Sequence, residues 1–283
     1  MEIELANRQT VRRILAHFAL RAQKKWGQNF LIRPAVVADI AAAAGVGPGD
    51  RVLEIGPGIG TLTQGLARTG AAVTAIELDR RLVEVLAETL AAYPEVRIVS
   101  GDVLQTDVGA LMEGQPFAVA ANLPYYITTP ILMYLLESRL PLTRLVLMMQ
   151  REVAQRITAV PGSKNAGAIT MAVQYRTQAR MLFDVPPSSF MPAPEVMSTV
   201  VELVPRPAPP IAVADERLLF RLVKAAFANR RKVYRNNLKA LYDGAAADAM
   251  LAAAGLDGNR RGETFTWEEW RRLTEAAHAY ASK

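Results

Sequence analysis

The stretch RVLEIGPGIG, residues 51–60, decides the fold of this 283-residue chain. Its first five residues are mostly apolar, as in a buried strand, and glycines follow at positions 56, 58 and 60. Glycine has no side chain, so such a turn lets a ligand approach the backbone closely, although a plain tight turn has the same composition. An apolar helical spacing starts at Leu62. The stretch predicts a strand, a glycine-rich turn and a helix.

The same alternation of strand and helix continues beyond this stretch. Short runs rich in β-branched residues lie at 73–76, 96–99, 117–121 and 145–149, with helical spacings between them. Such alternation predicts an α/β fold with a doubly wound, mainly parallel sheet. Two further β-like runs, residues 171–175 and 199–204, are not separated by a long helix. They suggest an antiparallel hairpin at the edge of the sheet.

A stiff segment, PRPAPP at residues 205–210, divides the chain into two parts of different composition. We expect a larger domain over residues 1–205 and a smaller one over residues 206–283. The length of the chain agrees with one large and one small domain.

The second part has the pattern of a small all-α domain. Residues 218–227 have apolar side chains at helical spacing behind Asp215, a possible N-cap. Residues 245–254 form an alanine-rich stretch that Gly255 should stop. A last helix should start at Thr266, with a glutamate three residues later to complete a capping box.

The composition restricts the function classes. The chain has no Cys and only two His, which argues against disulfides, thiolate catalysis and histidine- or cysteine-based metal sites. The N-terminus is charged and no run approaches the roughly 18 apolar residues of a membrane span. We therefore expect a metal-free, cytoplasmic protein without a membrane segment. The net charge of +6 favours a polyanionic partner.

Basic residues are concentrated in the second part. Between positions 217 and 239 stand Arg217, Arg221, Lys224, Arg230, Arg231, Lys232, Arg235 and Lys239, and only Glu216 opposes them nearby. A merely solvated helix face would intersperse acidic residues. We expect contacts with RNA phosphates here, above all from Arg230, Arg231, Lys232 and Arg235. A smaller cluster comprises Arg21, Lys24 and Lys25.

Two carboxylates follow the second and third predicted strands, at the same edge of the sheet as the glycine-rich turn. Glu77 can accept hydrogen bonds from both hydroxyls of a ribose, and Asp102 is within reach of an adenine amine. A nicotinamide dinucleotide would use a similar turn, but Thr61 occupies the last glycine position of that fingerprint. The spacing is similar instead to that of class I methyltransferases.

The fourth strand runs directly into Asn122-Leu123-Pro124-Tyr125, which resembles the signature of methyltransferases that act on planar amino groups. The lone pair of an adenine N6 amine is delocalised into the ring, so an enzyme must accept its hydrogen bonds and position it. The Asn122 oxygen and the Leu123 carbonyl can accept, Pro124 stiffens the turn and Tyr125 can stack on an extruded base. The neutral amine needs no prior general base, in keeping with the lack of a catalytic triad.

The whole set of motifs resembles one family, the ribosomal RNA adenine dimethyltransferases of the KsgA type. The motifs are KWGQNFL (residues 25–31), GPGIG (56–60), NLPY (122–125), VPPSSFMPAP (185–194), FANRRK (227–232) and RNNL (235–238). The resemblance implies a Rossmann-like, seven-stranded class I methyltransferase sheet with a small all-α C-terminal domain.

The resemblance also implies roles for residues and the identity of the partners. The cofactor would be S-adenosylmethionine, and its contacts would be Asn29, Leu31, Gly56, Gly58, Glu77, Asp102 and Asn122. Phe190 would stack on the target adenine opposite Tyr125. The substrate would be two adjacent adenosines in the 3′-terminal hairpin of 16S ribosomal RNA, dimethylated on N6 by a monomeric enzyme within an assembling small subunit.

Departures from the family pattern and three alternatives remain at this point. Glu195, Met197 and Ala168 differ from the usual residues, which affects the expected RNA contacts. The alternatives are an erythromycin-resistance type methyltransferase of large-subunit RNA, an assembly or transcription factor that does not need catalysis, and a nicotinamide oxidoreductase. Leu123 and the basic second part argue against the first of these.

Overall fold

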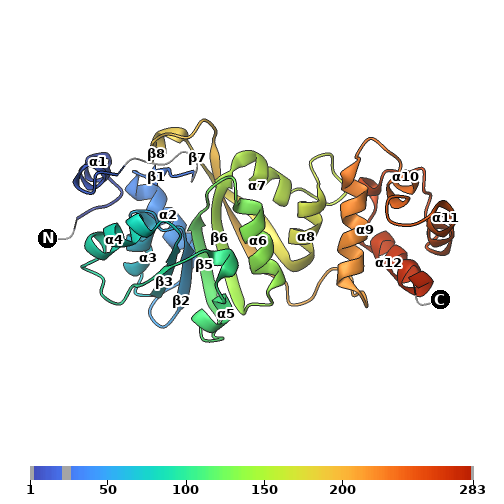
Figure 1. Ribbon diagram of the computed structural model, residues 1–283, viewed down its shortest axis with the longest axis horizontal. Helices are drawn as coiled ribbons and strands as arrows, with labels where there is room; N and C mark the ends of the chain where they lie inside the picture. The colour runs from blue at the N-terminus through green and yellow to red at the C-terminus, as the bar shows by residue number, and fades with distance from the viewer. Residues whose placement is uncertain (1–2, 21–26, 282–283) are drawn as a thin grey trace. The chain divides into compact units, whose positions relative to one another are not determined.

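The computed structural model describes residues 3–20 and 27–281. The chain forms two compact units, one of Met1–Ala154 with Ala179–Pro205 and the other of Gln155–Gln178 with Arg206–Lys283. Their elements can be followed by label in Figure 1. The basic cluster of Arg21, Lys24 and Lys25 lies outside the described residues, as do the first two residues of the KWGQNFL motif.

The first unit is built on a seven-stranded sheet of order β4-β3-β2-β5-β6-β9-β7. Its strands are β2 (Arg51–Ile55), β3 (Ala72–Glu77), β4 (Arg97–Ser100), β5 (Phe117–Asn122), β6 (Leu142–Gln150), β7 (Thr177–Val185) and β9 (Ser198–Pro205). Neighbours from β4 to β6 pair in parallel, and β9 pairs antiparallel with β6. The strands predicted from the glycine-rich stretch to residue 149 are confirmed, as is the strand at 199–204. A separate antiparallel pair joins β1 (Phe30–Leu31) to β8 (Phe190–Met191).

The helices of this part of the chain are α1 (Arg8–His17), α2 (Pro34–Ala44), α3 (Thr61–Ala67), α4 (Arg80–Thr89), α5 (Val108–Leu111), α6 (Thr128–Glu137) and α7 (Arg151–Ile157), with short 3₁₀ turns at Val103–Gln105 and Pro187–Ser189. Helices α2, α3 and α4 pack against the sheet. Val37 and Ile40 of α2 and Leu66 of α3 pack in one core cluster with the strand residues Val52 and Val146. This packing fixes the carboxyl ends of β2, β3 and β5 relative to one another.

The prediction of a strand over residues 171–175 is wrong, because this segment belongs to helix α8 (Ala168–Arg176). Met171 and Tyr175 are one helical turn apart and are both buried in the core of the second unit, together with Leu219. Burial of this helical face outweighs the weak local preference for a strand. Residues 155–178, which the sequence placed in the first domain, consequently group with the second unit.

The rest of the second unit is helical, as predicted. Its helices are α9 (Glu216–Ala228), α10 (Tyr234–Leu238), α11 (Gly244–Ala253) and α12 (Trp267–Ala281), with a 3₁₀ turn at Gly262–Thr264. Asp215 caps α9 by accepting from Leu218 N at 2.9 Å. Thr266 and Glu269 form the predicted capping box, with reciprocal bonds of 2.8 and 3.3 Å. Gly255, at a φ of +63°, follows α11. Among the described residues, no helix is both long enough and apolar enough to cross a bilayer.

Candidate active site

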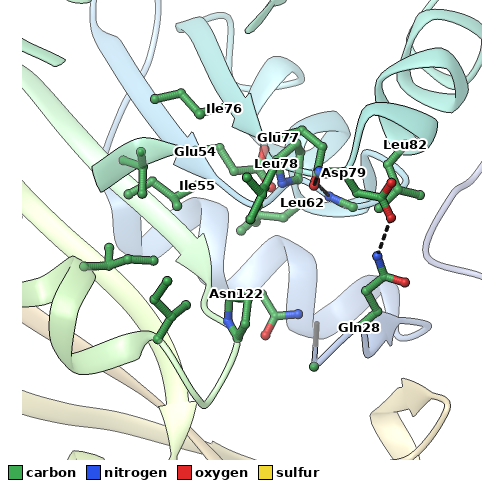
Figure 2. A pocket seen from close by; sticks show the side chains of 18 of the residues that line it. Gln28, Glu54, Ile55, Leu62, Ile76, Glu77, Leu78, Asp79, Leu82 and Asn122 are labelled. Carbon is green, nitrogen blue, oxygen red and sulfur yellow. Dashed lines mark hydrogen bonds between the residues drawn. The ribbon is translucent and has the colours of Figure 1, made fainter. Parts of the chain in front are cut away.

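A cavity lies in the first unit, where the carboxyl ends of β2, β3 and β5 meet the segment that contains β1 (Figure 2). Its lining includes the residues that the sequence singled out for a cofactor, namely Asn29, Leu31, Gly56, Gly58, Glu77, Asp102 and Asn122. Parallel strands place the turns that follow them at one edge of the sheet, which is why residues far apart in sequence converge here.

Glycine is required at position 58 of the turn. Its φ is +64°, in the left-handed region, and an added Cβ would lie 3.3 Å from the ring of Phe30. At Gly56, with a φ of +71°, a Cβ would meet nothing within 4 Å. The backbone is thus exposed to the cavity at Gly56, and the Gly58 N–H donates to Oε2 of Glu77 at 3.1 Å.

Glu77 is held in the cavity by two hydrogen bonds from the backbone. Its Oε1 accepts from the Asp79 N–H at 2.8 Å, and its Oε2 accepts from Gly58. The side chain is only 6% exposed, and this burial raises the pKa of Glu77 above its usual value. Each carboxylate oxygen has two lone pairs, so acceptor capacity toward the cavity remains.

Asp102 and Asp79 complete the acidic side of the cavity. Asp102 caps the turn after β4, because its Oδ1 accepts from Leu104 N at 2.9 Å. Gln28 donates from Nε2 to Oδ2 of Asp79 at 3.1 Å and so ties the β1 segment to the end of β3 (Figure 2). The hydrogen bonds from Arg81 hold the pKa of Asp79 below its usual value.

The orientation of the Asn122 amide is set by the β1 segment. Its Nδ2 donates to the backbone oxygen of Asn29 at 3.1 Å, so its Oδ1 is left to accept. The Asn29 side chain is itself held by a 3.1 Å bond to Gly27 O. A Cβ at Gly27 would lie 3.5 Å from that of Pro124, so the two loops are in close contact. The predicted acceptor is therefore preorganised.

The NLPY residues divide between the cavity and the protein interior. Asn122 and Pro124 line the cavity, whereas Leu123 is 1% exposed and donates its N–H to Met148 O at 3.1 Å. The hydroxyl of Tyr125 lies 2.6 Å from Oγ of Ser198. Tyr125 is half-buried and is not part of the described lining.

Phe190 is not brought to the cavity. Its ring is 1% exposed and packs in the core cluster that includes Leu31 and Val200. The pairing of β8 with β1, in which Phe190 faces Leu31, turns the ring inward. The stacking role expected for Phe190 stays a prediction, and it requires the ring to leave this core.

The basic residues of the second unit fall into two groups. Arg230 is paired with Glu263 and also donates to Lys164 O, and Arg235 is paired with Asp248. Arg231 and Lys232 are exposed and, among the described residues, their side chains have neither an ion pair nor a hydrogen bond. The four cations predicted to bind RNA could not be told apart in the sequence, but of these four only Arg230 and Arg235 are paired with carboxylates among the described residues.

Several residues of the cavity were not predicted from the sequence. Tyr126, 54% exposed, and Leu78, 40% exposed, are apolar surfaces at its rim. Glu54 is 1% exposed, its Oε2 has no hydrogen-bond partner within the part of the chain that the structure describes, and burial raises its pKa to about 8. The sequence did contain a signal for Glu54, because a charged residue is unusual in a strand that is expected to be buried.

The cavity suits a nucleoside that carries an amine. Its polar groups are mainly acceptors: the carboxylates of Glu77 and Asp102 and the oxygen of Asn122. Ribose hydroxyls, an adenine amine and an ammonium group are donors, and S-adenosylmethionine has all three. The residues present therefore fit this cofactor, with exposed backbone at Gly56 for a close approach.

Comparisons with known proteins agree with this geometry. A model of the family "Ribosomal RNA adenine dimethylase" matches residues 19–278. The chain is 45% identical to the ribosomal RNA small subunit methyltransferase A of Geobacillus thermodenitrificans, over 98% of each chain. It is 47% identical to the protein of that name from Moorella thermoacetica, over 89% of this chain and 91% of the relative.

Solved structures show the same fold. A dimethyladenosine transferase from Plasmodium falciparum has a TM-score of 0.73 at 22% identity, covering 89% of this chain and 98% of that one. The 23S rRNA methyltransferase ErmE has a TM-score of 0.67 at 29% identity, covering 88% of this chain and 100% of that one. The expected class I methyltransferase fold is confirmed, and this chain belongs to the ribosomal RNA adenine dimethylase family.

Proposed function

We propose that this protein transfers methyl groups from S-adenosylmethionine to the N6 amines of two adjacent adenosines in the 3′-terminal hairpin of 16S ribosomal RNA, during ribosome biogenesis. The observation that carries the proposal is the Asn122 amide, whose oxygen is free to accept at the edge of a cavity that also holds Glu77 and Asp102. A small-subunit substrate is supported by the curated relatives, which are more similar to this chain than the 23S enzyme is.

The cofactor contacts follow from the donor and acceptor types. Glu77 accepts from the ribose hydroxyls, and Asp102 accepts from the adenine amine. The exposed backbone at Gly56 and Gly58 and the segment with Asn29 and Leu31 enclose the methionine part. When bound, S-adenosylmethionine supplies an electrophilic methyl group.

The chemistry at the target amine requires positioning more than proton transfer. Oδ1 of Asn122 and the Leu123 carbonyl accept the N6 hydrogens and hold the amine in line with the methyl group. Pro124 stiffens the turn, and the ring of Tyr125 supports the extruded base. The neutral amine would take the methyl group as the methyl–sulfur bond breaks and S-adenosylhomocysteine leaves, and the cationic amine would then release a proton to water. A second cycle gives the dimethyl form.

The remaining parts of the proposal concern partners and location. Arg230, Arg231, Lys232 and Arg235 contact RNA phosphates, with the larger share from the unpaired Arg231 and Lys232. We propose further that the enzyme acts as a monomer and uses no metal ion. It works in the cytoplasm on assembling small subunits.

The test is incubation of the protein with labelled S-adenosylmethionine and unmethylated small or large subunits, followed by mass analysis of the nucleosides. We expect N6,N6-dimethyladenosine in small-subunit RNA alone. Label in large-subunit RNA would instead support an erythromycin-resistance type activity. Binding of the cofactor and of small subunits without any dimethyladenosine would overturn the proposal in favour of an assembly factor.

A further inference from the structure

One side-chain hydrogen bond links the NLPY loop to a distant strand. The hydroxyl of Tyr125 and Oγ of Ser198 are 2.6 Å apart, across 73 positions of sequence. Ser198 is the first residue of β9 and is completely buried. Its position is fixed by the β6–β9 ladder, in which it faces Gln150, and the neighbouring bond from Arg151 N to Met197 O at 3.0 Å closes the end of that ladder.

This bond holds the Tyr125 ring at its far end. The sheet order places β6 between β5 and β9. Strand spacing is about 4.8 Å, so the side chain of Tyr125 reaches over the end of β6 to a strand about 10 Å away. The backbone end is held as well, since Pro124 O accepts from Ile127 N at 3.1 Å and from Thr128 Oγ1 at 3.0 Å. The ring is therefore restrained at both ends.

The restraint acts on the side of the loop that does not line the cofactor cavity. Pro124 and Tyr126 line that cavity, whereas Tyr125, between them, extends toward β9. Asn122, whose oxygen is free, lies at the start of the same loop. The Tyr125 ring is half-buried, so part of its surface remains available to a base.

We propose that Ser198 is a positioning residue for methyl transfer, because its hydroxyl holds the Tyr125 ring in one orientation as a fixed support for the target adenine. The inference rests on the proposed function for the identity of that base. A free tyrosine ring would lose rotational freedom each time a base stacks on it, and the bond to Ser198 removes that cost in advance. Ser198 itself touches neither substrate nor cofactor.

The test is a double-mutant cycle with Ser198→Ala, Tyr125→Phe and the double variant. Single-turnover transfer from labelled S-adenosylmethionine to small subunits is measured at saturating cofactor. Loss of one neutral hydrogen bond should slow transfer by about 3- to 10-fold in each single variant. The double variant should be no slower than either single variant, because both remove the same bond. The affinity for S-adenosylhomocysteine, measured by calorimetry, should stay within about twofold of wild type.

Two further variants separate positioning from general destabilisation. Thr199→Val changes the next residue of β9, which is equally buried and donates to Asp184 at 2.6 Å, but whose side chain points to the other face of the strand. It should transfer at the wild-type rate, while Ser198→Thr, which keeps a hydroxyl, should restore most of the rate. Averaging of the Tyr125 χ1 angle, measured from NMR coupling constants, should increase in Ser198→Ala but not in Ser198→Thr or Thr199→Val.

The outcomes are distinct from a failure of the proposed function. The positioning role is overturned if wild type forms dimethyladenosine but the fold-reduction in transfer rate of the double variant equals the product of the fold-reductions of the two single variants. The same holds if Thr199→Val is as slow as Ser198→Ala, or if the Tyr125 χ1 angle is averaged no more without the serine. If wild type itself transfers no methyl group, the proposed function fails, and the χ1 measurement alone then decides whether Ser198 restrains Tyr125.

Discussion

The cofactor cavity of the first unit and the basic surface of the second unit, which consists of Arg230, Arg231, Lys232 and Arg235, differ in how firmly their polar groups are held. In the cavity, Glu77 and Asn122 are each held by hydrogen bonds that involve the backbone, so their free lone pairs have fixed directions. On the basic surface, Arg231 and Lys232 are long side chains that are exposed to solvent. Fixed acceptors select one small molecule by geometry, whereas exposed cations attract phosphates of varied position by charge.

Burial explains why the two regions should respond differently to substitution. A lost hydrogen bond in a buried site leaves a partner unsatisfied, which costs more than the bond contributed. Exposed charges are screened by water and salt, so each contributes little alone. The comparison therefore predicts large, specific effects in the cavity and small, salt-dependent effects on the basic surface.

The largest effect should come from Asn122→Ala. It removes the proposed acceptor of the target amine but leaves Glu77 and Asp102 in place, so transfer should fall on the order of 100- to 1000-fold while cofactor affinity changes only a few-fold. Single-turnover rates and calorimetric titration with S-adenosylhomocysteine measure the two quantities. The exposed Asn259→Ala is the matched control. A loss mainly of cofactor affinity would contradict the role given to Asn122.

The next largest effect should come from Glu77→Ala, which removes a charged acceptor. Affinity for S-adenosylhomocysteine should fall about 10- to 100-fold, whereas the exposed Glu84→Ala should bind as wild type does. Burial raises the pKa of Glu77, so affinity should also decline on acidification at a higher pH than an ordinary glutamate would cause. An unchanged affinity with slow transfer would reverse the roles of Glu77 and Asn122.

Protonation of the buried Glu54 should make the free energy of unfolding depend on pH. Its pKa is raised from 4.5 to about 8 by burial, so between these values the folded state keeps a proton that the unfolded state releases. Stability from this group is therefore lost as pH rises, by up to about 1.4 kcal/mol per pH unit.

In Glu54→Gln the side chain is neutral in both states. Its free energy of unfolding should fall less between pH 5.5 and 8 than that of wild type, by roughly 1 to 3 kcal/mol. Urea denaturation at each pH measures this difference, and Glu84→Gln serves as the exposed control. Parallel pH profiles for wild type and Glu54→Gln would show that Glu54 is ionised in the folded protein.

The smallest effects should occur on the basic surface. The double variant Arg231→Ala with Lys232→Ala should bind small subunits about 10-fold more weakly near physiological salt. The slope of the logarithm of the binding constant against the logarithm of the salt concentration should become less steep by about 1.5. Removal of a whole ion pair, Arg235→Ala with Asp248→Ala, keeps the net charge and should change affinity less than about threefold. An equal loss in both double variants would mean that Arg235 contributes as much to phosphate binding as Arg231 and Lys232 do.

The sequence by itself determined the features that depend on neighbouring residues. The glycine-rich turn at residues 56–60, the strands before and after it, and the caps at Asp215 and Thr266 were all predictable, because a turn or a cap involves groups within a few residues. Glu77 and Asp102 could be placed in one cavity because parallel strands end at a common edge.

Only the tertiary structure decided which groups meet across long separations. It turned residues 171–175 into a helix and buried Phe190 against Leu31. It also paired Arg235 with Asp248 and joined Tyr125 to Ser198. Local preferences differ by about 1 kcal/mol or less, whereas burial of one large side chain contributes about 2 to 3 kcal/mol. Packing therefore overrides local preference wherever distant segments compete for the same core.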